Sequence, residues 1–299
     1  NKVADRFLPV VEPKLREEYN EKAIRTITTK MVTSDRLNFE QKNKFLDNLQ
    51  NNKCVNHKLF LSSGHYSIDD LFYNDPVNQA MFLEFFTFGA GEKRAGKGEH
   101  ALAIMSTEIK QKGTGDIDVS GKPVELKTAV AKGSGRLGEG GVNTEQVMAV
   151  IKKYPELSQA FEQFKAQKGQ KSINITDFTS LVNSIDYDQS KRAQIGKDIF
   201  ETTRFGSAGG IITNAFAKPN ADPKNVHHAY IAANFDWYKK NPDMGGAWEY
   251  LSSISLGSRA MVTATSGEDL VKLYTSGALA SSKPAVVPTQ PTDTFFQVN

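Results

Sequence analysis

Hydrophobic residues recur at helical spacing through the first third of the chain. One periodic run begins at Glu12–Pro13 and continues to Ile27, and proline suits the first turn of a helix. Residues 81–86 (MFLEFF) are apolar almost all round, which is typical of a buried helix. Further helix starts are expected at Ser34, Ser67 and Asp75–Pro76.

The spacing changes to an alternation of period two near residue 116. Before it, residues 99–110 have helical spacing that includes Ile109. After it, residues 116–119 and 124–130 alternate as short strands, separated by Ser120–Gly121. A turn of this kind links antiparallel neighbours, so the pattern predicts a β-hairpin.

The later segments give weaker patterns. Helices are expected at 144–164, 176–184 and 189–203, with a capped helix start at Ser266, and strands at 172–175, 226–234, 250–256 and 259–265. In the strand at 226–234, His227 and His228 would point to opposite faces and could not chelate one metal together. The Ser/Pro/Thr-rich tail from residue 276 is expected to be extended or disordered.

These elements predict an α/β fold. We expect a helical N-terminal region (1–90), a core of helix, short mixed β-sheet and helix (91–205), a mixed α/β C-terminal extension (206–275) and a flexible tail (276–299).

Composition narrows the class of protein only slightly. The 299-residue chain has a net charge of +3, which is too small to indicate nucleic acid binding by itself. Its single cysteine, Cys54, cannot form an internal disulfide. There is no apolar signal region at the N-terminus, and no stretch approaches the roughly 18 apolar residues of a membrane span. We therefore expect a soluble, cytoplasmic protein without membrane partners.

The hairpin carries the candidate chemistry. If Ser120 and Gly121 are the two central turn residues, Asp116 pairs with Glu125, and the two side chains lie on one face. Carboxylates so close raise each other's pKa unless a cation lies between them, and Mg²⁺ prefers carboxylate oxygens. Lys127 returns to the same face. Its ammonium could orient or activate a water and stabilise charge on a phosphate.

Asp116 followed by Glu125-Leu126-Lys127 resembles the signature of the PD-(D/E)xK, or restriction-endonuclease-like, nuclease superfamily. The resemblance covers about residues 98–175. It implies Mg²⁺-dependent hydrolysis of DNA, with Mn²⁺ as a substitute, and a metal held by Asp116, Glu125, the Leu126 backbone carbonyl and an acidic helix residue, here Glu99. Gln146 matches a glutamine that often follows on the next helix.

Three features depart from the family pattern. The expected helix at 99–110 leaves little room for the strand that usually precedes the Asp strand. Gly115 replaces the usual proline before the Asp. Asp118 competes with Asp116, because a longer turn would shift the register of the hairpin.

Two glycine-rich basic loops flank the hairpin, and they contain the candidate phosphate contacts. These are Lys93, Arg94, Lys97, Lys132 and Arg136. Residues 133–138 also match the dinucleotide-binding glycine pattern. We do not expect a dinucleotide site there, because the next helix begins only after Asn143 and the surrounding βαβ arrangement is missing.

The sequence therefore predicts a metal-dependent DNA endonuclease with Glu99, Asp116, Glu125 and Lys127 as catalytic residues. The compact motif also resembles bacteriophage sequences, which implies a location in the host cytoplasm or the virion. The competing hypotheses are a catalytically inactive DNA-binding or phage structural module of the same fold and an RNA-directed nuclease. The sequence is compatible with a homo-oligomer under each of these hypotheses.

Overall fold

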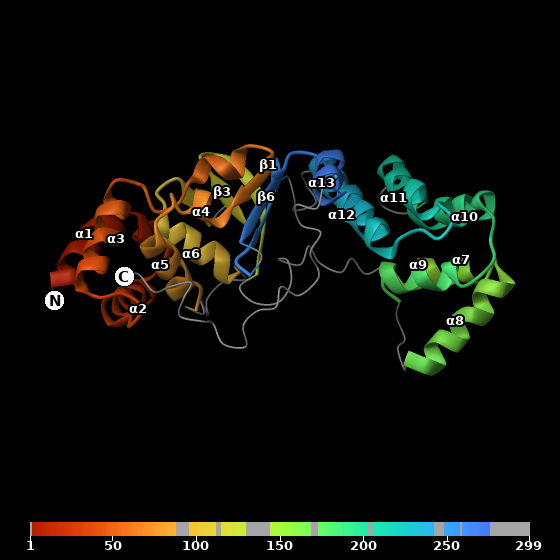
Figure 1. Ribbon diagram of the computed structural model, residues 1–299, viewed down its shortest axis with the longest axis horizontal. Coiled ribbons are helices and arrows are strands. Elements are labelled where there is room, and N and C mark those ends of the chain that lie inside the picture. The colour runs from red at the N-terminus through yellow and green to blue at the C-terminus, as the bar shows by residue number, and fades with distance from the viewer. Residues whose placement is uncertain are drawn as a thin grey trace. The chain divides into compact units, whose positions relative to one another are not determined.

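The computed structural model describes residues 2–87, 96–111, 115–129, 144–168, 173–202, 206–241, 248–257 and 259–275. The protein is a mixed α/β protein (Figure 1). Its contacts divide into two compact units: the described residues within 1–136 and 245–265 form the first, and those within 137–244 and 266–275 form the second. Among the described residues, no helix has the length and apolar character to cross a membrane.

The N-terminal half of the first unit is helical, as the sequence predicts. Its helices are α1 (Lys2–Glu18), α2 (Glu21–Thr33), α3 (Phe39–Gln50), α4 (Ile68–Leu71), α5 (Pro76–Phe86) and α6 (Lys97–Met105). The expected helix starts at Ser67 and Asp75 are confirmed, since each side chain accepts a hydrogen bond from a first-turn amide. Almost all of α5 is buried, including Phe82 and Phe85.

The expected single run from Glu12–Pro13 to Ile27 is wrong. α1 begins at Lys2 and contains Pro9 and Pro13 within it. The helix is interrupted before Asn20. The Asn20 side chain accepts a hydrogen bond from the Ala23 amide at 2.9 Å and caps the start of a second helix. An N-cap asparagine favours a helix start strongly enough to divide a continuous apolar pattern.

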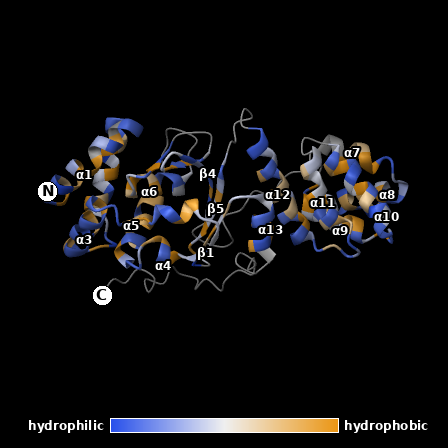
Figure 2. Cartoon of the chain, turned by 90° about the horizontal axis from the view of Figure 1, so that it is seen from above, coloured by the Kyte–Doolittle hydropathy of each residue, from blue (hydrophilic) through white to orange (hydrophobic). Residues whose placement is uncertain are grey.

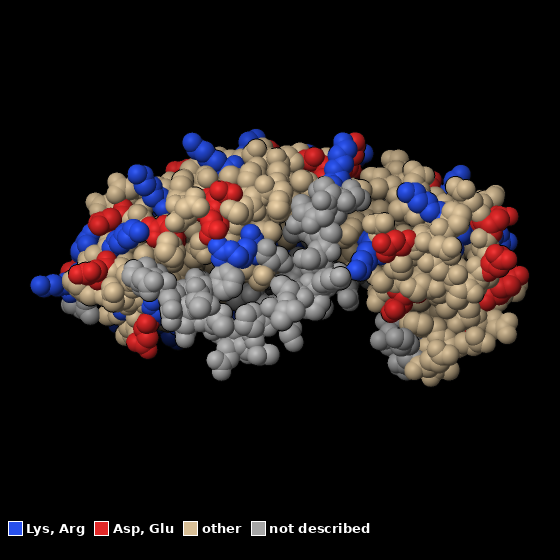
Figure 3. Space-filling view, in the orientation of Figure 1, with Lys and Arg blue, Asp and Glu red and all other residues tan. Residues whose placement is uncertain are grey.

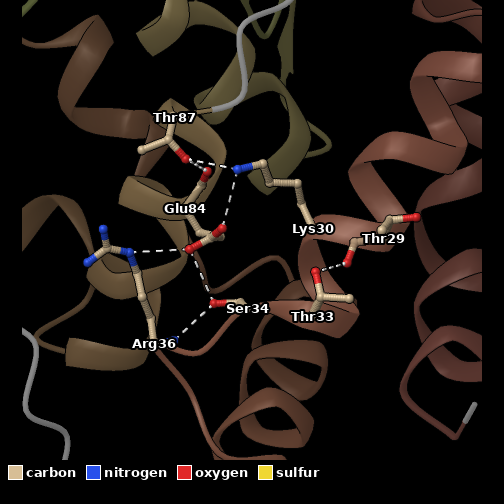
Figure 4. Close-up of polar contacts among 7 residues, drawn as sticks. All are labelled: Thr29, Lys30, Thr33, Ser34, Arg36, Glu84 and Thr87. Carbon is tan, nitrogen blue, oxygen red and sulfur yellow. Dashed lines mark hydrogen bonds and ion pairs between the residues drawn. The ribbon is translucent and has the colours of Figure 1, made fainter.

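A network of polar contacts joins α2 to the end of α5. The Glu84 carboxylate is 14% exposed and lies 3.2 Å from Arg36 Nε and 3.6 Å from Lys30 Nζ. The Ser34 hydroxyl also donates to Glu84, and Lys30 donates to the Thr87 hydroxyl (Figure 4). Several cations and a hydroxyl thus satisfy one shielded carboxylate and fix the two helices together.

One six-stranded mixed sheet completes the first unit. Its strands are β1 (Gly64–Ser67), β2 (Ile109–Lys110), β3 (Ile117–Val119), β4 (Lys122–Ala129), β5 (Tyr250–Ser255) and β6 (Ala260–Ala264). Their order is β1-β6-β5-β4-β3-β2. Among the described strands, only β4 and β5 pair in parallel. The strands expected at 250–256 and 259–265 are confirmed, and they join the same sheet as the predicted hairpin.

The helix expected over 99–110 is too long. α6 ends at Met105, and Ser106 has an extended backbone with φ −143° and ψ 135°. The Lys14 ammonium donates to the carbonyl oxygens of Ala103, Ser106 and Ile109, where the helix ends. A cation satisfies the last carbonyls of a helix. The chain then forms β2, so a short strand does precede the Asp116 segment.

Gly98 lets α6 lie directly against β4. A Cβ on Gly98 would approach the Thr128 hydroxyl and would lie 2.7 Å from Thr128 Cβ. Real Cβ atoms do not come so close to other atoms. The missing side chain therefore sets the distance between helix and strand, and with it the position of the neighbouring Glu99.

We expect Gly98→Ala to lower the free energy of unfolding by about 1–3 kcal/mol, the usual cost of overpacking a filled contact. Chemical denaturation measures the change. The double variant with Thr128→Gly should show a smaller loss than the two single losses added, because the two residues share one contact. A more stable Gly98→Ala protein would contradict the close approach, since it would show that alanine's better helix propensity outweighs the clash.

The second unit is a set of helices. They are α7 (Thr144–Ile151), α8 (Pro155–Lys168), α9 (Ile175–Asn183), α10 (Gln189–Gly196), α11 (Gly209–Phe216), α12 (Pro223–Lys240) and α13 (Gly267–Thr275), with a π-helical turn at Lys197–Glu201. Figure 2 shows both polar and apolar residues along these helices. The Phe216 ring packs against Phe178 and Phe200, with ring centroids 5.7 and 5.6 Å apart, in the buried core.

Three predictions in this unit are wrong. The helix expected at 144–164 is two helices, because Pro155 disfavours helical backbone in the residue before it. The strand expected at 172–175 is replaced, where described, by Asn174 as the N-cap of α9. The strand expected at 226–234 lies inside α12, which Asp222 caps and Pro223 opens.

Several other predictions for the C-terminal half are confirmed, and one concerns residues outside the described part of the chain. α9 and α13 are confirmed, and the helix expected at 189–203 is present as α10 with the π-helical turn. His227 and His228 lie on α12 and not on a strand. The tail from residue 276 lies outside the described residues. The two units also divide the chain differently from the boundaries expected at residues 90 and 205.

Candidate active site

The hairpin between β3 and β4 has the register that the sequence predicts. Ser120 and Gly121 both have positive φ, at 51° and 85°, as a tight two-residue hairpin turn requires. Ile117 pairs with Val124. One step further from the turn, this register sets Asp116 opposite Glu125.

The Lys127 ammonium lies between the two carboxylates. Its Nζ donates to Asp116 Oδ2 at 3.2 Å and to Glu125 Oε1. The Leu126 amide donates to the same Asp116 oxygen at 2.8 Å. The side chains of Lys127, Asp116 and Glu125 are 30%, 27% and 13% exposed. The structure thus brings together the three hairpin residues of the motif in a partly shielded position.

Gly115 allows Asp116 to approach β4. A Cβ on Gly115 would lie 2.7 Å from the Val124 carbonyl oxygen and 3.0 Å from the Val124 nitrogen. These are backbone atoms of a central strand, which cannot move aside without breaking the pairing. The position therefore excludes any side chain, including the proline that the resemblance would lead one to expect.

Asp118 has a different role in the hairpin. Its carboxylate accepts a hydrogen bond from the Gly121 amide at 2.8 Å. It therefore stabilises the turn, while Asp116 contacts Lys127. The geometry favours Asp116 over Asp118 as the partner of Glu125.

Glu99 approaches the hairpin from the first turn of α6. The pKa of Glu99 is raised to about 7, chiefly by burial and then by the negative charge of Asp116, against the opposing effects of a backbone hydrogen bond with Gly96 and the charge of Lys127. The Glu125 carboxylate also raises it. Glu99 is therefore close enough to all three hairpin residues to share their electrostatic field.

The charges of the hairpin residues depend on one another. Burial raises the pKa of Glu125 to about 7, which Lys127 opposes and Asp116 reinforces. Burial lowers the pKa of Lys127, but the carboxylates of Glu125 and Asp116 outweigh this effect and hold the pKa above its ordinary value. Lys127 therefore stays charged, and the group holds more carboxylate than one ammonium can neutralise.

This surplus of negative charge predicts a pH-dependent stability for the metal-free protein. Glu99 and Glu125 bind protons more tightly in the folded state, so their stabilising contribution is complete below pH 4.5 and is lost as the pH rises through about 7. His100 and His228 act oppositely, since burial lowers each pKa from 6.5 to about 4. The stability that these two histidines contribute is fully present above pH 6.5.

We therefore expect the free energy of unfolding to fall as the pH rises from 6.5 through about 7. Denaturant titrations at a series of pH values measure it. In Glu125→Gln, which cannot ionise at this position, the fall should be smaller. An equal fall in both proteins would contradict the assignment to this carboxyl.

The donor set of the site suits a hard divalent cation. Three carboxyls and the Leu126 carbonyl are oxygen ligands of the kind that Mg²⁺ prefers, and burial, reinforced by the Asp116 charge, raises the pKa of Glu99 and of Glu125. In the described part of the chain, no three His, Cys, Asp or Glu side chains are arranged as a preformed metal-binding group. At Asp116 and Glu125 the Lys127 ammonium supplies the bridging cation.

The remaining candidate residues are less closely tied to the hairpin. Lys97 is exposed at the start of α6. Lys93, Arg94, Lys132 and Arg136 lie outside the described residues. Gln146 belongs to α7 of the helical unit, and its side chain is likewise outside the described part. On the face drawn in Figure 3, the Lys and Arg side chains of the described residues are interspersed with Asp and Glu.

The sequence does not indicate that a neighbouring strand brings a residue to this site. Ser253 of β5 pairs with Lys127 of β4. No signal near residue 253 indicates this pairing, because it joins strands more than a hundred residues apart.

Comparisons with known protein families, with curated proteins and with solved structures give no match for this chain.

Proposed function

We propose that the protein is a Mg²⁺-dependent DNA nuclease of the PD-(D/E)xK class. The observation that carries the proposal is the convergence of Asp116, Glu125 and Lys127 in the predicted register. Isolated acidic and basic residues on a strand are usually exposed ion pairs of little consequence. Here the three side chains are partly shielded, and Glu99 adds a carboxyl with a raised pKa.

The arrangement of elements supports a restriction-endonuclease-like core. α6 precedes an antiparallel series of β2, β3 and β4, and β5 pairs in parallel with β4. This agrees with the helix and short mixed sheet that the resemblance implies. Helices α7 to α12 of the second unit lie between β4 and β5 in the chain, and α13 of the same unit follows β6.

Each site residue has a role in the proposed hydrolysis. Asp116, Glu125, Glu99 and the Leu126 carbonyl would hold the ion, which when bound supplies Lewis acidity at the phosphate. Lys127, the only cation among these side chains, would orient the attacking water and stabilise negative charge that develops on the phosphate. The Asp116 bond to the Leu126 amide holds that carboxylate in place before any ligand arrives.

Incubation of linear and circular DNA with the protein tests the proposal. We expect cleavage with Mg²⁺ or Mn²⁺ and none with a chelator. Cleavage of circular DNA would show endonuclease action, and digestion of linear DNA alone would show exonuclease action. A parallel RNA substrate separates the DNA-directed from the RNA-directed reading. Intact nucleic acid under every metal condition would overturn the proposed activity.

A catalytically inactive module is the competing proposal, and one observation favours it. The Lys127 ammonium satisfies both carboxylates at once, as in an ion group kept for structure. Such a protein would bind DNA, or a partner in a virion, without cutting it. Binding without cleavage across metals and DNA forms would support this alternative.

A further inference from the structure

Ser253 lies beside Lys127 in the central sheet. β4 and β5 run parallel, with Lys127 paired to Ser253 and Glu125 paired to Leu251. Paired residues of adjacent strands have side chains on the same face, and successive residues alternate. Ser253 therefore shares the face of Glu125 and Lys127.

The Ser253 hydroxyl is buried and has no hydrogen-bond partner in the described protein. Its neighbour Ser252 provides a direct contrast. The Ser252 hydroxyl is also buried, but it lies on the other face, 2.9 Å from the Thr263 hydroxyl with which it shares a hydrogen bond. A buried hydroxyl without a hydrogen-bond partner destabilises the folded state, because it has lost its bonds to water. Stability alone would favour an apolar residue at position 253.

A group that arrives in the working state would account for this hydroxyl. The Lys127 ammonium has three protons, and Asp116 and Glu125 are the two acceptors found for them. An ion held by these carboxylates would weaken both contacts. The ammonium would then need an acceptor on its own face of the sheet, and Ser253 is its nearest neighbour along the sheet on that side.

We propose that Ser253 is a positioning residue, whose hydroxyl accepts a hydrogen bond from Lys127 when a divalent ion engages Asp116 and Glu125. This inference rests on the proposed function. It assigns Ser253 no contact with the substrate. Its effect on the reaction passes through the position of the Lys127 ammonium.

The test compares Ser253→Ala with Ser252→Ala in the full chain. Loss of the unpartnered Ser253 hydroxyl should leave the stability of the metal-free protein unchanged or higher. The variant should also show a smaller rise in unfolding temperature on addition of Mg²⁺. Its kcat should be about 10–100-fold lower at an unchanged KM for DNA, which is the usual loss for residues that hydrogen-bond to the groups of a metal site without binding the metal.

The control variants should behave differently. Ser252→Ala breaks the bond to Thr263, so it should lower stability without Mg²⁺ and leave kcat and the Mg²⁺ response of the folded protein unchanged. Ser253→Thr keeps a hydroxyl and should restore a large part of the Mg²⁺ response.

Two outcomes would overturn the inference, and they are distinguishable. If the wild type responds to Mg²⁺ and Ser253→Ala responds equally, only the role of Ser253 fails. If the wild type neither cleaves DNA nor responds to Mg²⁺, the proposed function fails together with it.

Discussion

Replacing Lys127 by methionine is expected to lower kcat for Mg²⁺-dependent DNA cleavage by a factor of ~10²–10³, the usual loss when one charge-stabilising group is removed from a site. Methionine keeps an unbranched side chain in β4 but removes the ammonium that lies between Asp116 and Glu125. The KM for DNA should change much less, because the ammonium acts on charge that develops during the reaction. Steady-state cleavage kinetics measure both.

Lys122 provides a matched control on the same strand. Its ammonium contacts Glu249 at 2.9 Å, and both side chains are well exposed. Lys122→Met should therefore leave kcat unchanged. Metal-free Lys127→Met should be less stable than wild type, since two close carboxylates lose their shared cation, and Mg²⁺ should restore part of that stability. Undiminished turnover by a folded Lys127→Met protein would contradict the assigned role.

Asp116→Ala is expected to lower kcat for DNA cleavage about as much as Lys127→Met does. Asp118→Ala should retain cleavage. Asp116 holds the Leu126 amide and the Lys127 ammonium, and the loss of this partly shielded acceptor should also lower the free energy of unfolding by about 1–3 kcal/mol. Asp118 accepts only the turn amide of Gly121 among the contacts found for it. Its removal should cost about 1 kcal/mol of stability.

The pair of variants decides the register question that the sequence leaves open. Cleavage assays and denaturant titrations on both proteins are sufficient. The opposite result, with Asp118 essential and Asp116 dispensable, would place the metal ligand two residue pairs nearer the turn and contradict the arrangement described above.

The hairpin was predictable because its information is local. Ser120–Gly121 fixes a two-residue turn, and the alternation around it leaves one register that buries Ile117, Val119 and Val124 together. The same holds for helices with a clear first residue, such as α5 after Asp75. In these segments the deciding contacts lie within a few residues in the chain.

The errors arose where local patterns compete or distant contacts decide. The segment 226–234 can be read as an alternating strand, but Asp222 and Pro223 give a stronger helix start, and Val226, Tyr230 and Ala233 then form one buried face of α12. The end of α6 depends on Lys14, about ninety residues earlier in the chain.

The site shows the same division between local and distant contacts. Asp116, Glu125 and Lys127 lie on one hairpin, so the sequence suffices to group them. The packing of Gly98 against Thr128, the closeness of Gly115 to Val124 and the pairing of Ser253 with Lys127 depend on how separate elements assemble. No pattern within any one of these segments contains that information.

Hydrolysis at the hairpin site can be tested by DNA digestion in water enriched in oxygen-18, followed by mass spectrometry of the new ends. Hydrolysis by a water positioned at Lys127 predicts one heavy oxygen on the terminal phosphate of each cut. The label should require Mg²⁺ and should be lost in Lys127→Met. DNA that stays intact with every divalent ion, or cuts that carry no label from the water, would contradict the account.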